Sequence, residues 1–263
     1  MNESLLLDWL YKGRLHSYPQ IYTAKGGNCM PYYGFSYGYL SYLWFMLPAI
    51  VITIVAQAKV KSTFHKYSSV HNYNGLTGAE AARRVLMLNG ITNVSVEYVN
   101  GHLTDHYDPR TNVIRLSDSV YHVSSVAAVG VAAHEAGHAV QYATGYAPIK
   151  IRGALVPVTN IGSNLSTPLI LLGLFMNSEI MIWLGIFLFS FAVLFSLVTL
   201  PVEFNASRRA IQVLGESGTL YGEELDGAKK VLTAAAMTYV ASTLTALLSL
   251  LRLLLIFGRR NHN

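Results

Sequence analysis

Two long segments without a single charged residue constrain the fold of this chain more than any other feature. One runs from Tyr39 to Ala58 and the other from Ile180 to Leu200. About 20 consecutive apolar residues, wound into a helix, are enough to cross the hydrocarbon core of a bilayer. Because a segment in lipid must satisfy its own backbone hydrogen bonds, both segments are predicted to be transmembrane helices.

Two further segments are candidate transmembrane helices of less uniformly apolar composition. Ala154 to Met176 is apolar towards its end but contains several polar residues and two prolines, Pro157 and Pro168, which would kink a helix. Ala234 to Phe257 is long enough to span but contains Arg252, so it either crosses the membrane or lies in the interface. The sequence therefore predicts a mainly α membrane protein with about four transmembrane helices.

The composition supports this class and excludes others. Hydrophobic residues make up 52% of the 263 residues and charged residues only 13%, about half the usual share of a soluble domain. The net charge of +5 comes mostly from basic residues beside the apolar segments, which is typical of positive charge kept on the cytoplasmic side. A lipid bilayer is therefore the expected partner, and nucleic acid is not.

A region of mixed character separates the apolar segments. Thr77 and Glu80 have the spacing of a capping box, which predicts a helix that starts there and ends near Asn89. Alternating residues from Val94 to Tyr98 and a short apolar run from Val113 to Leu116 predict two strands. A helix is predicted from Ser124 to Ala143, so this region should be a small α+β domain.

The predicted helix carries the pattern H-E-x-x-H, with the residues His134, Glu135, Ala136, Gly137 and His138. Positions i and i+4 lie on the same face of a helix, so the two imidazoles can bind one zinc ion. Glu135 lies about 100° round the helix, where it can accept a proton from a water molecule on the metal without being a ligand. The sequence thus predicts a zinc site with Glu135 as the general base.

A catalytic zinc site needs a third protein ligand, and two acidic residues are candidates. Glu203 follows the second uncharged segment, and Asp226 lies in the run Leu225-Asp226-Gly227 among four charged neighbours. Glu203 is preferred because Pro201 can begin a helix whose first turn would hold its carboxylate rigidly at the membrane surface. Asp226 is expected in a mobile, solvated loop.

The motif and the run from Glu203 to Ala210 together resemble the YugP-like neutral zinc metallopeptidases of bacterial membranes. The resemblance includes further runs at 59–64, 76–82 and 105–110, and it covers the chain from about Tyr39 onward. It implies a gluzincin, in which two histidines from one helix and a glutamate from a later helix bind one Zn²⁺ ion. Expected activity is hydrolysis of peptide bonds in a protein or peptide substrate, by a zincin-like catalytic region.

A more distant similarity is to the HtpX-type and CAAX-processing membrane proteases, whose later motif reads Glu-x-x-Ala-Asp. Ser207 occupies the position of that aspartate, so the carboxylate that would orient a ligand histidine is missing there. His106 and Arg208 are possible contacts to the substrate or the transition state. Val113 to Leu116 is expected to be an edge strand that pairs with extended substrate, as in the related proteases.

The predicted order along the chain is an extension (1–38), a transmembrane helix (39–58), the catalytic region (59–152), a transmembrane hairpin (153–200), the third-ligand helix and loop (201–233) and a final apolar segment (234–263). His138 and Glu203 can share a metal only if two membrane crossings separate them, and the hairpin supplies two. Its turn lacks Lys and Arg, whereas Lys150, Arg152 and Arg208 flank its other end. The catalytic site of this multi-pass cell-membrane protein is therefore expected to face the cytoplasm.

Two other interpretations stay open at this stage. A site-2-type intramembrane protease also uses H-E-x-x-H, with an aspartate from a Leu-Asp-Gly motif that Asp226 would provide. A non-catalytic membrane scaffold with a zinc site is the other, although a structural site would not require Glu135. The sequence does not identify the substrate or the oligomeric state.

Overall fold

Four long helices dominate the computed structural model, which describes residues 33–258 and, except at 33–43 and 45, their side chains. They are α2 (Tyr33–Ser68), α5 (Ala147–Phe175), α6 (Glu179–Glu216) and α7 (Glu223–Gly258). All four are long and apolar enough to cross a membrane, which confirms the expected fold class and includes the final segment among the candidate spans. Most of the predicted extension and the end of the final apolar segment, from residue 259, lie outside the described residues.

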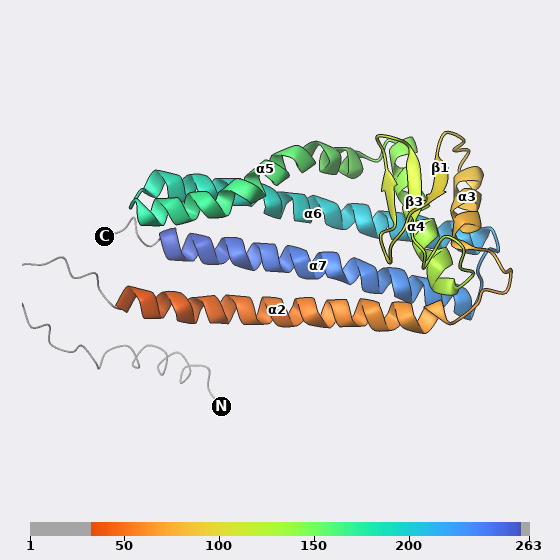
Figure 1. Ribbon diagram of the computed structural model, residues 1–263, viewed down its shortest axis with the longest axis horizontal. Coiled ribbons are helices and arrows are strands. Elements are labelled where there is room, and N and C mark those ends of the chain that lie inside the picture. Colours follow the sequence, from red (N-terminus) through yellow and green to blue (C-terminus); the bar gives the residue numbers. More distant parts are fainter. Residues whose placement is uncertain (1–32, 259–263) are drawn as a thin grey trace, which may run out of the picture. The chain divides into compact units, whose positions relative to one another are not determined.

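From Gly38 onward the chain forms one compact unit. In it α6 packs extensively against α5 and α7 (Figure 1). Two shorter helices, α3 (Gly78–Leu88) and α4 (Val126–Ala143), and a small sheet complete the unit. Both short helices pack against α6, and α4 also contacts α7. The largest hydrophobic core lies among these elements and includes Val85, Ile114, Val129 and Leu214.

The capping box at the start of α3 is present as predicted. The side chain of Thr77 accepts a hydrogen bond from the backbone N–H of Glu80, and the Glu80 carboxylate accepts one from the backbone N–H of Thr77. The two bonds satisfy backbone donors that the first turn of a helix leaves unpaired. This reciprocal cap fixes the start of α3, which packs against α4, the helix that carries the H-E-x-x-H motif.

The sheet has three strands, β1 (Ser95–Tyr98), β2 (His106–Asp108) and β3 (Val113–Leu116). Their order is β1-β3-β2, with β1 parallel and β2 antiparallel to β3. The strand from Val113 to Leu116 is therefore confirmed, but its prediction as an edge strand is wrong. Its central residue Ile114 is 0% exposed, because strands on both sides and the core cover it. The edge nearer α4 belongs to β2.

Helices α5 and α6 form a close hairpin that depends on small residues. A Cβ atom added at Gly162 would lie 2.8 Å from the carbonyl oxygen of Leu188, and one at Gly185 would lie 2.8 Å from that of Ser166. Small residues allow helix backbones to approach in this way within lipid, where the hydrophobic effect does not drive helices together. The hairpin thereby positions α6 relative to α5, and the later part of α6 packs against α3 and α4.

Helix α6 runs without interruption through Pro201, which lies inside it. The expectation that Pro201 begins a new helix is therefore wrong, because the apolar helix simply continues past it. Prolines are tolerated in membrane helices when neighbouring groups satisfy the freed backbone carbonyl. At 1.5 Å per residue, Glu203 lies about 36 Å along α6 from Glu179, close to where a hydrocarbon core of about 30 Å would end.

Candidate metal centre

The two histidines of α4 and Glu203 of α6 converge on one point. Nε2 of His134 lies 3.3 Å from Oε2 of Glu203, and Nε2 of His138 lies 3.7 Å from the same oxygen. One ligand atom from each residue lies within 4.8 Å of the other two. Among the described residues, this is the group of three or more metal-ligating side chains that could hold a metal ion.

The spacing fits a tetrahedral zinc site. With zinc-to-ligand distances of about 2.0–2.1 Å, adjacent tetrahedral ligands are roughly 3.4 Å apart, and both measured distances are near that value. Oε2 of Glu203 is also buried without a hydrogen-bond donor. An unpaired carboxylate oxygen in a buried position is costly, and a cation between the three side chains would remove that cost. The residues present therefore fit one zinc ion.

Glycine in the motif makes this convergence possible. A Cβ atom added at Gly137 would lie 2.7 Å from the carbonyl oxygen of Ala206 on α6. That distance is shorter than real Cβ contacts, so α4 and α6 can cross this closely only where the residue lacks a side chain. Gly137 directly precedes His138, and Ala206 lies three residues after Glu203. The close contact of these two residues therefore brings the histidines and Glu203 together.

Each ligand histidine has a neutral hydrogen-bond partner on its other nitrogen. Nδ1 of His134 is 3.1 Å from Oγ of Ser207, and Nδ1 of His138 is 3.0 Å from Oε1 of Gln141. When Nε2 binds a metal, Nδ1 carries the proton and donates to these oxygens, which fixes the orientation of each ring. Ser207, at the position where related proteases have aspartate, therefore still contacts the histidine.

Gln141 also ties α4 to α6 on the opposite side of its amide. Its Nε2 donates to the carbonyl oxygen of Val202 at 2.8 Å and to Oδ1 of Asn205 at 3.0 Å. Oδ1 of Asn205 in turn accepts a hydrogen bond from Nε of Arg209. The sequence analysis missed Gln141, although a buried amide at i+3 from a ligand histidine, within an apolar helix, is a usable signal.

A cavity of about 170 Å³ lies beside the ligands. Glu135 lines it together with His134 and Glu203, so the predicted base shares one space with two of the three predicted ligands. Other elements complete the wall, with Leu103 and Asp105 just before β2 and Tyr239 from α7. The lining comes from four separate parts of the chain, and the sequence analysis did not identify Tyr239.

Negative charge dominates around the ligands, and one arginine compensates it in part. Burial acts to lower the pKa of His138, but the Glu203 carboxylate beside Nε2 and the charge of Glu135 outweigh it and raise the pKa. Nη1 of Arg152 on α5 lies 3.8 Å from Oε1 of Glu203. Arg152 was expected only as a charge that flanks the membrane hairpin, whereas the structure places it at the site.

Three other predicted residues are not brought to this cluster. Nδ1 of His106 is hydrogen-bonded to the backbone oxygen of Thr104, and its exposed ring does not line the cavity. Arg208 is exposed on α6 and does not line the cavity either. Asp226 lies in the first turn of α7, rather than in the expected loop, and lines a different cleft.

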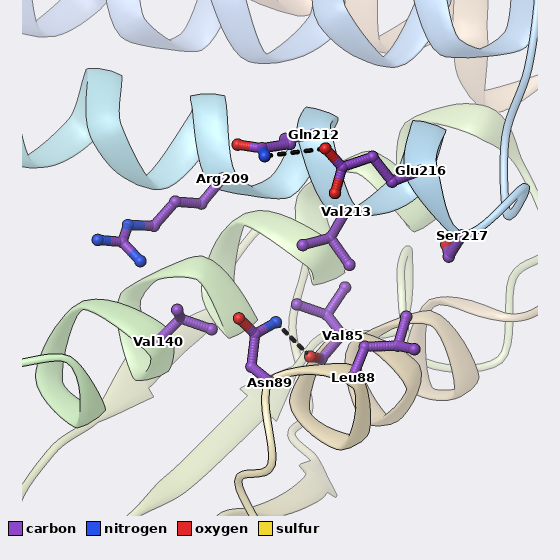
Figure 2. A pocket seen from close by; sticks show the side chains of 9 residues that line it. All are labelled: Val85, Leu88, Asn89, Val140, Arg209, Gln212, Val213, Glu216 and Ser217. Carbon is purple, nitrogen blue, oxygen red and sulfur yellow. Dashed lines mark hydrogen bonds between the residues drawn. The ribbon is translucent and has the colours of Figure 1, made fainter.

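A second cavity, of about 400 Å³, lies on another side of α4, between α3 and α6 (Figure 2). Its polar groups are largely satisfied locally, since Gln212 donates to Glu216 and Asn89 donates to the backbone oxygen of Val85. It holds no group of metal-ligating side chains. Its lining residues are Val85, Leu88, Asn89, Val140, Arg209, Gln212, Val213, Glu216 and Ser217.

Comparison with known proteins gives the class to which this site belongs. Residues 42–258 match the family described as "putative neutral zinc metallopeptidase", and the chain belongs to that family. It is similar to a protein of Bacillus subtilis (strain 168) described as "Putative membrane protease YugP". The two are 48% identical over 216 residues, which cover 82% of this chain and 96% of that protein. No solved structure matches the chain.

We predict that Glu203, and not Asp226, completes the zinc site. Glu203→Ala removes one of three ligands, which should weaken zinc binding by several kcal/mol out of the roughly 10–16 kcal/mol typical of protein zinc sites. Asp226→Ala should leave zinc binding unchanged, because its carboxylate lines another cleft. Zinc content per chain, measured by elemental analysis after purification, provides the comparison.

Glu203→Gln serves as a second variant because it keeps the size of the side chain and so the crossing of α4 and α6. Circular dichroism of each variant separates loss of metal from loss of fold. Full zinc occupancy in folded Glu203→Ala, or loss of zinc in Asp226→Ala, would overturn the ligand assignment.

Proposed function

We propose that this chain is a zinc-dependent, membrane-embedded endopeptidase that hydrolyses peptide bonds with Glu135 as its general base. The observation that carries the proposal is the convergence of His134, His138 and Glu203 beside a cavity that Glu135 also lines. Three protein ligands leave a fourth tetrahedral position open, which is the arrangement of catalytic rather than structural zinc sites. Membership of the zinc metallopeptidase family supports the same reaction.

The residues divide the work of peptide hydrolysis between them. Zinc, when bound, supplies Lewis acidity, which acidifies a water molecule and polarises a carbonyl. Glu135 accepts the proton of the attacking water and delivers it to the leaving amine. Ser207 and Gln141 hold the two imidazoles in the tautomer that leaves Nε2 free to bind metal. Arg152 offsets part of the charge of Glu203.

The position of β2 makes it the proposed platform for the substrate backbone. It is an edge strand, paired with β3 on one side, and it contacts α4. Leu103 and Asp105, which precede it, line the cavity of the candidate site. An extended peptide that pairs with the free edge would run past Glu135 and place a carbonyl group beside the metal ligands.

The catalytic region is proposed to face the cytoplasm. Lys59, Lys61 and Lys66 lie towards the end of α2 that leads into the catalytic region, and Arg152 lies near the start of α5. The turn between α5 and α6, at residues 176–178, contains no Lys or Arg. This distribution follows the rule that short cytoplasmic loops are enriched in basic residues.

Two alternatives remain less well supported. A site-2-type protease that uses Asp226 would need this carboxylate beside the histidines, and it lines a separate cleft. A zinc-binding scaffold without catalysis would not need a free carboxylate in the cavity, whereas Glu135 lies there beside the ligands. Zinc content of Glu203→Ala and Asp226→Ala separates the site-2 alternative from the proposal, and proteolysis by Glu135→Gln tests the scaffold.

The first prediction of the proposed function concerns the general base. Glu135→Gln should keep zinc but lower proteolysis by about 10²-fold or more, since the amide cannot accept the proton. Cleavage of a protein substrate is followed on gels, and zinc is quantified in the same preparation. Glu216→Gln on α6, outside the cavity, is the matched control and should remain fully active.

Loss of zinc from Glu135→Gln would contradict the assignment of a proton-transfer role without ligation. Unchanged proteolysis with zinc in place would exclude Glu135 as the general base and point to a different base, whereas a wild type that binds zinc but cleaves nothing would support the scaffold. Only retained metal with lost turnover agrees with the proposal.

The second prediction tests the edge strand. Peptide substrates methylated on single backbone nitrogens should lose cleavage efficiency at alternate positions near the scissile bond. Every second amide of a strand points towards its pairing partner, and methylation removes that donor. The ratio kcat/KM is measured for each methylated peptide, and a peptide methylated far from the scissile bond is the control. Equal cleavage of all the peptides would exclude strand pairing.

The third prediction concerns the side of the membrane. In a background with Cys29→Ser, a membrane-impermeant maleimide should label Ser178→Cys on intact cells, because this residue lies in the turn between α5 and α6. Ser69→Cys, beyond the end of α2, should react only after permeabilisation. The opposite pattern would place the catalytic region outside the cytoplasm.

A further inference from the structure

A large cleft between α2 and α7 is not part of the candidate metal centre. Its volume is about 760 Å³, and it is lined by Lys59, Ser62, Thr63, Lys66, Tyr67, Asp226, Lys229, Lys230, Thr233, Ala234 and Met237. The residues from α2 and α7 reach it from helices that run alongside each other (Figure 1). Four ammonium groups therefore share one space with a single carboxylate.

No carboxylate in the described part of the chain forms an ion pair with these lysines, although the ammonium group of Lys66 lies 5.4 Å from the centre of the Tyr67 ring. Asp226 lines the same cleft without pairing with any of them. Four positive charges at one opening, with one carboxylate beside them, repel each other, since their mutual energy rises as they are brought together. An anion in the cleft would turn this repulsion into attraction.

The cleft changes character along its length. Lys229 and Lys230 lie at its end nearest the catalytic region, whereas Ala234 and Met237 lie about one to two helical turns further along α7. These two parts of α7 are thus about 10 Å apart. On α2, Lys59 lies about 10 Å along the helix from Lys66, so one lysine also lines the cleft near the level of Met237. The polarity along α7 matches a molecule with an anionic head and an apolar tail.

Helix α2 leaves room for such a tail. Its last turns dock through Phe64 and Tyr67 against Ala127 and Val231. Before that docking, α2 makes no extensive contact with another helix in the described part of the chain. Most of its apolar side chains there are exposed, with Ile54 at 59% and Val55 at 61%, whereas Ala49 is buried. Acyl chains can therefore continue from the cleft along α2.

We infer that the cleft between α2 and α7 binds an anionic phospholipid, with its phosphate among Lys66, Lys229 and Lys230 and its acyl chains past Met237 towards the bilayer. Basic residues at the membrane surface attract anionic headgroups, and each contributes about a factor of five to binding. The lysines of α2 and α7 reach one headgroup from two sides, so the site is more specific than a diffuse basic surface. It would fix α2 against the rest of the protein.

The test is native mass spectrometry of the full-length protein in a non-ionic detergent, titrated with phosphatidylglycerol or phosphatidylcholine. The wild type should retain phosphatidylglycerol in preference to phosphatidylcholine. Replacing both Lys229 and Lys230 by glutamine should weaken retention of phosphatidylglycerol about 25-fold, as two lysines at roughly fivefold each. Lys229→Arg with Lys230→Arg should restore it.

The matched control is the pair Lys61→Gln and Lys150→Gln, which removes the same charge from exposed positions outside the cleft. It should weaken retention less than about threefold if the cleft holds the headgroup. An equal loss in both pairs, or equal retention of the two lipids by the wild type, would overturn the inference. Displacement of the lipid by sn-glycerol 1-phosphate would do so too, because it would show a site for soluble phosphate compounds.

Discussion

The buried carboxylate of Glu203 is the group on which the arrangement of this protein depends. The residue is 2% exposed, and an ionised carboxylate in such a place destabilises a fold by several kcal/mol unless charges or hydrogen-bond donors compensate it. Compensation comes from His134 and His138 on α4 and from Arg152 on α5. Helices α4 and α5 must therefore both approach α6 at the position of Glu203, and the fold brings these three helices together there.

Close helix contact is what makes this meeting possible. Gly162 and Gly185 let the two helices of the membrane hairpin approach backbone to backbone, so Arg152 and Glu203 reach the same level. On the other side, the amide of Gln141 bridges His138 and the backbone of α6. The membrane helices and the smaller domain thus share one polar centre, and neither part would have its own complete site.

The structure agrees best with prediction from the sequence where local patterns determine structure. The capping box at Thr77 is a pattern of neighbours along the chain, and the structure contains it. The order of the strands differs from the prediction, since Val113 to Leu116 is the central strand and not an edge strand. The sequence of a strand of three or four residues does not indicate which strands pair with it. Pro201 does not begin a helix as predicted, because the long apolar helix around it overrides the local preference of proline for a helix start.

The same distinction applies to the candidate site. The two histidines follow from helical spacing, and Glu203 could be named because membrane crossings bring it back to the same face. Arg152 and Tyr239 come from helices whose approach to the cavity depends on tertiary packing alone. Nothing near them in the sequence marks them, so only the three-dimensional arrangement identifies them.

The tight crossing at Gly137 affects how the effects of mutations in the motif should be interpreted. The pattern H-E-x-x-H treats its second x as free, yet here a methyl group at that position would meet the backbone of α6. A saturation mutagenesis screen for function would therefore score Gly137 as intolerant, alongside the histidines that flank it. Its intolerance would have a steric cause, and mutational sensitivity in this helix would not by itself identify a chemical role.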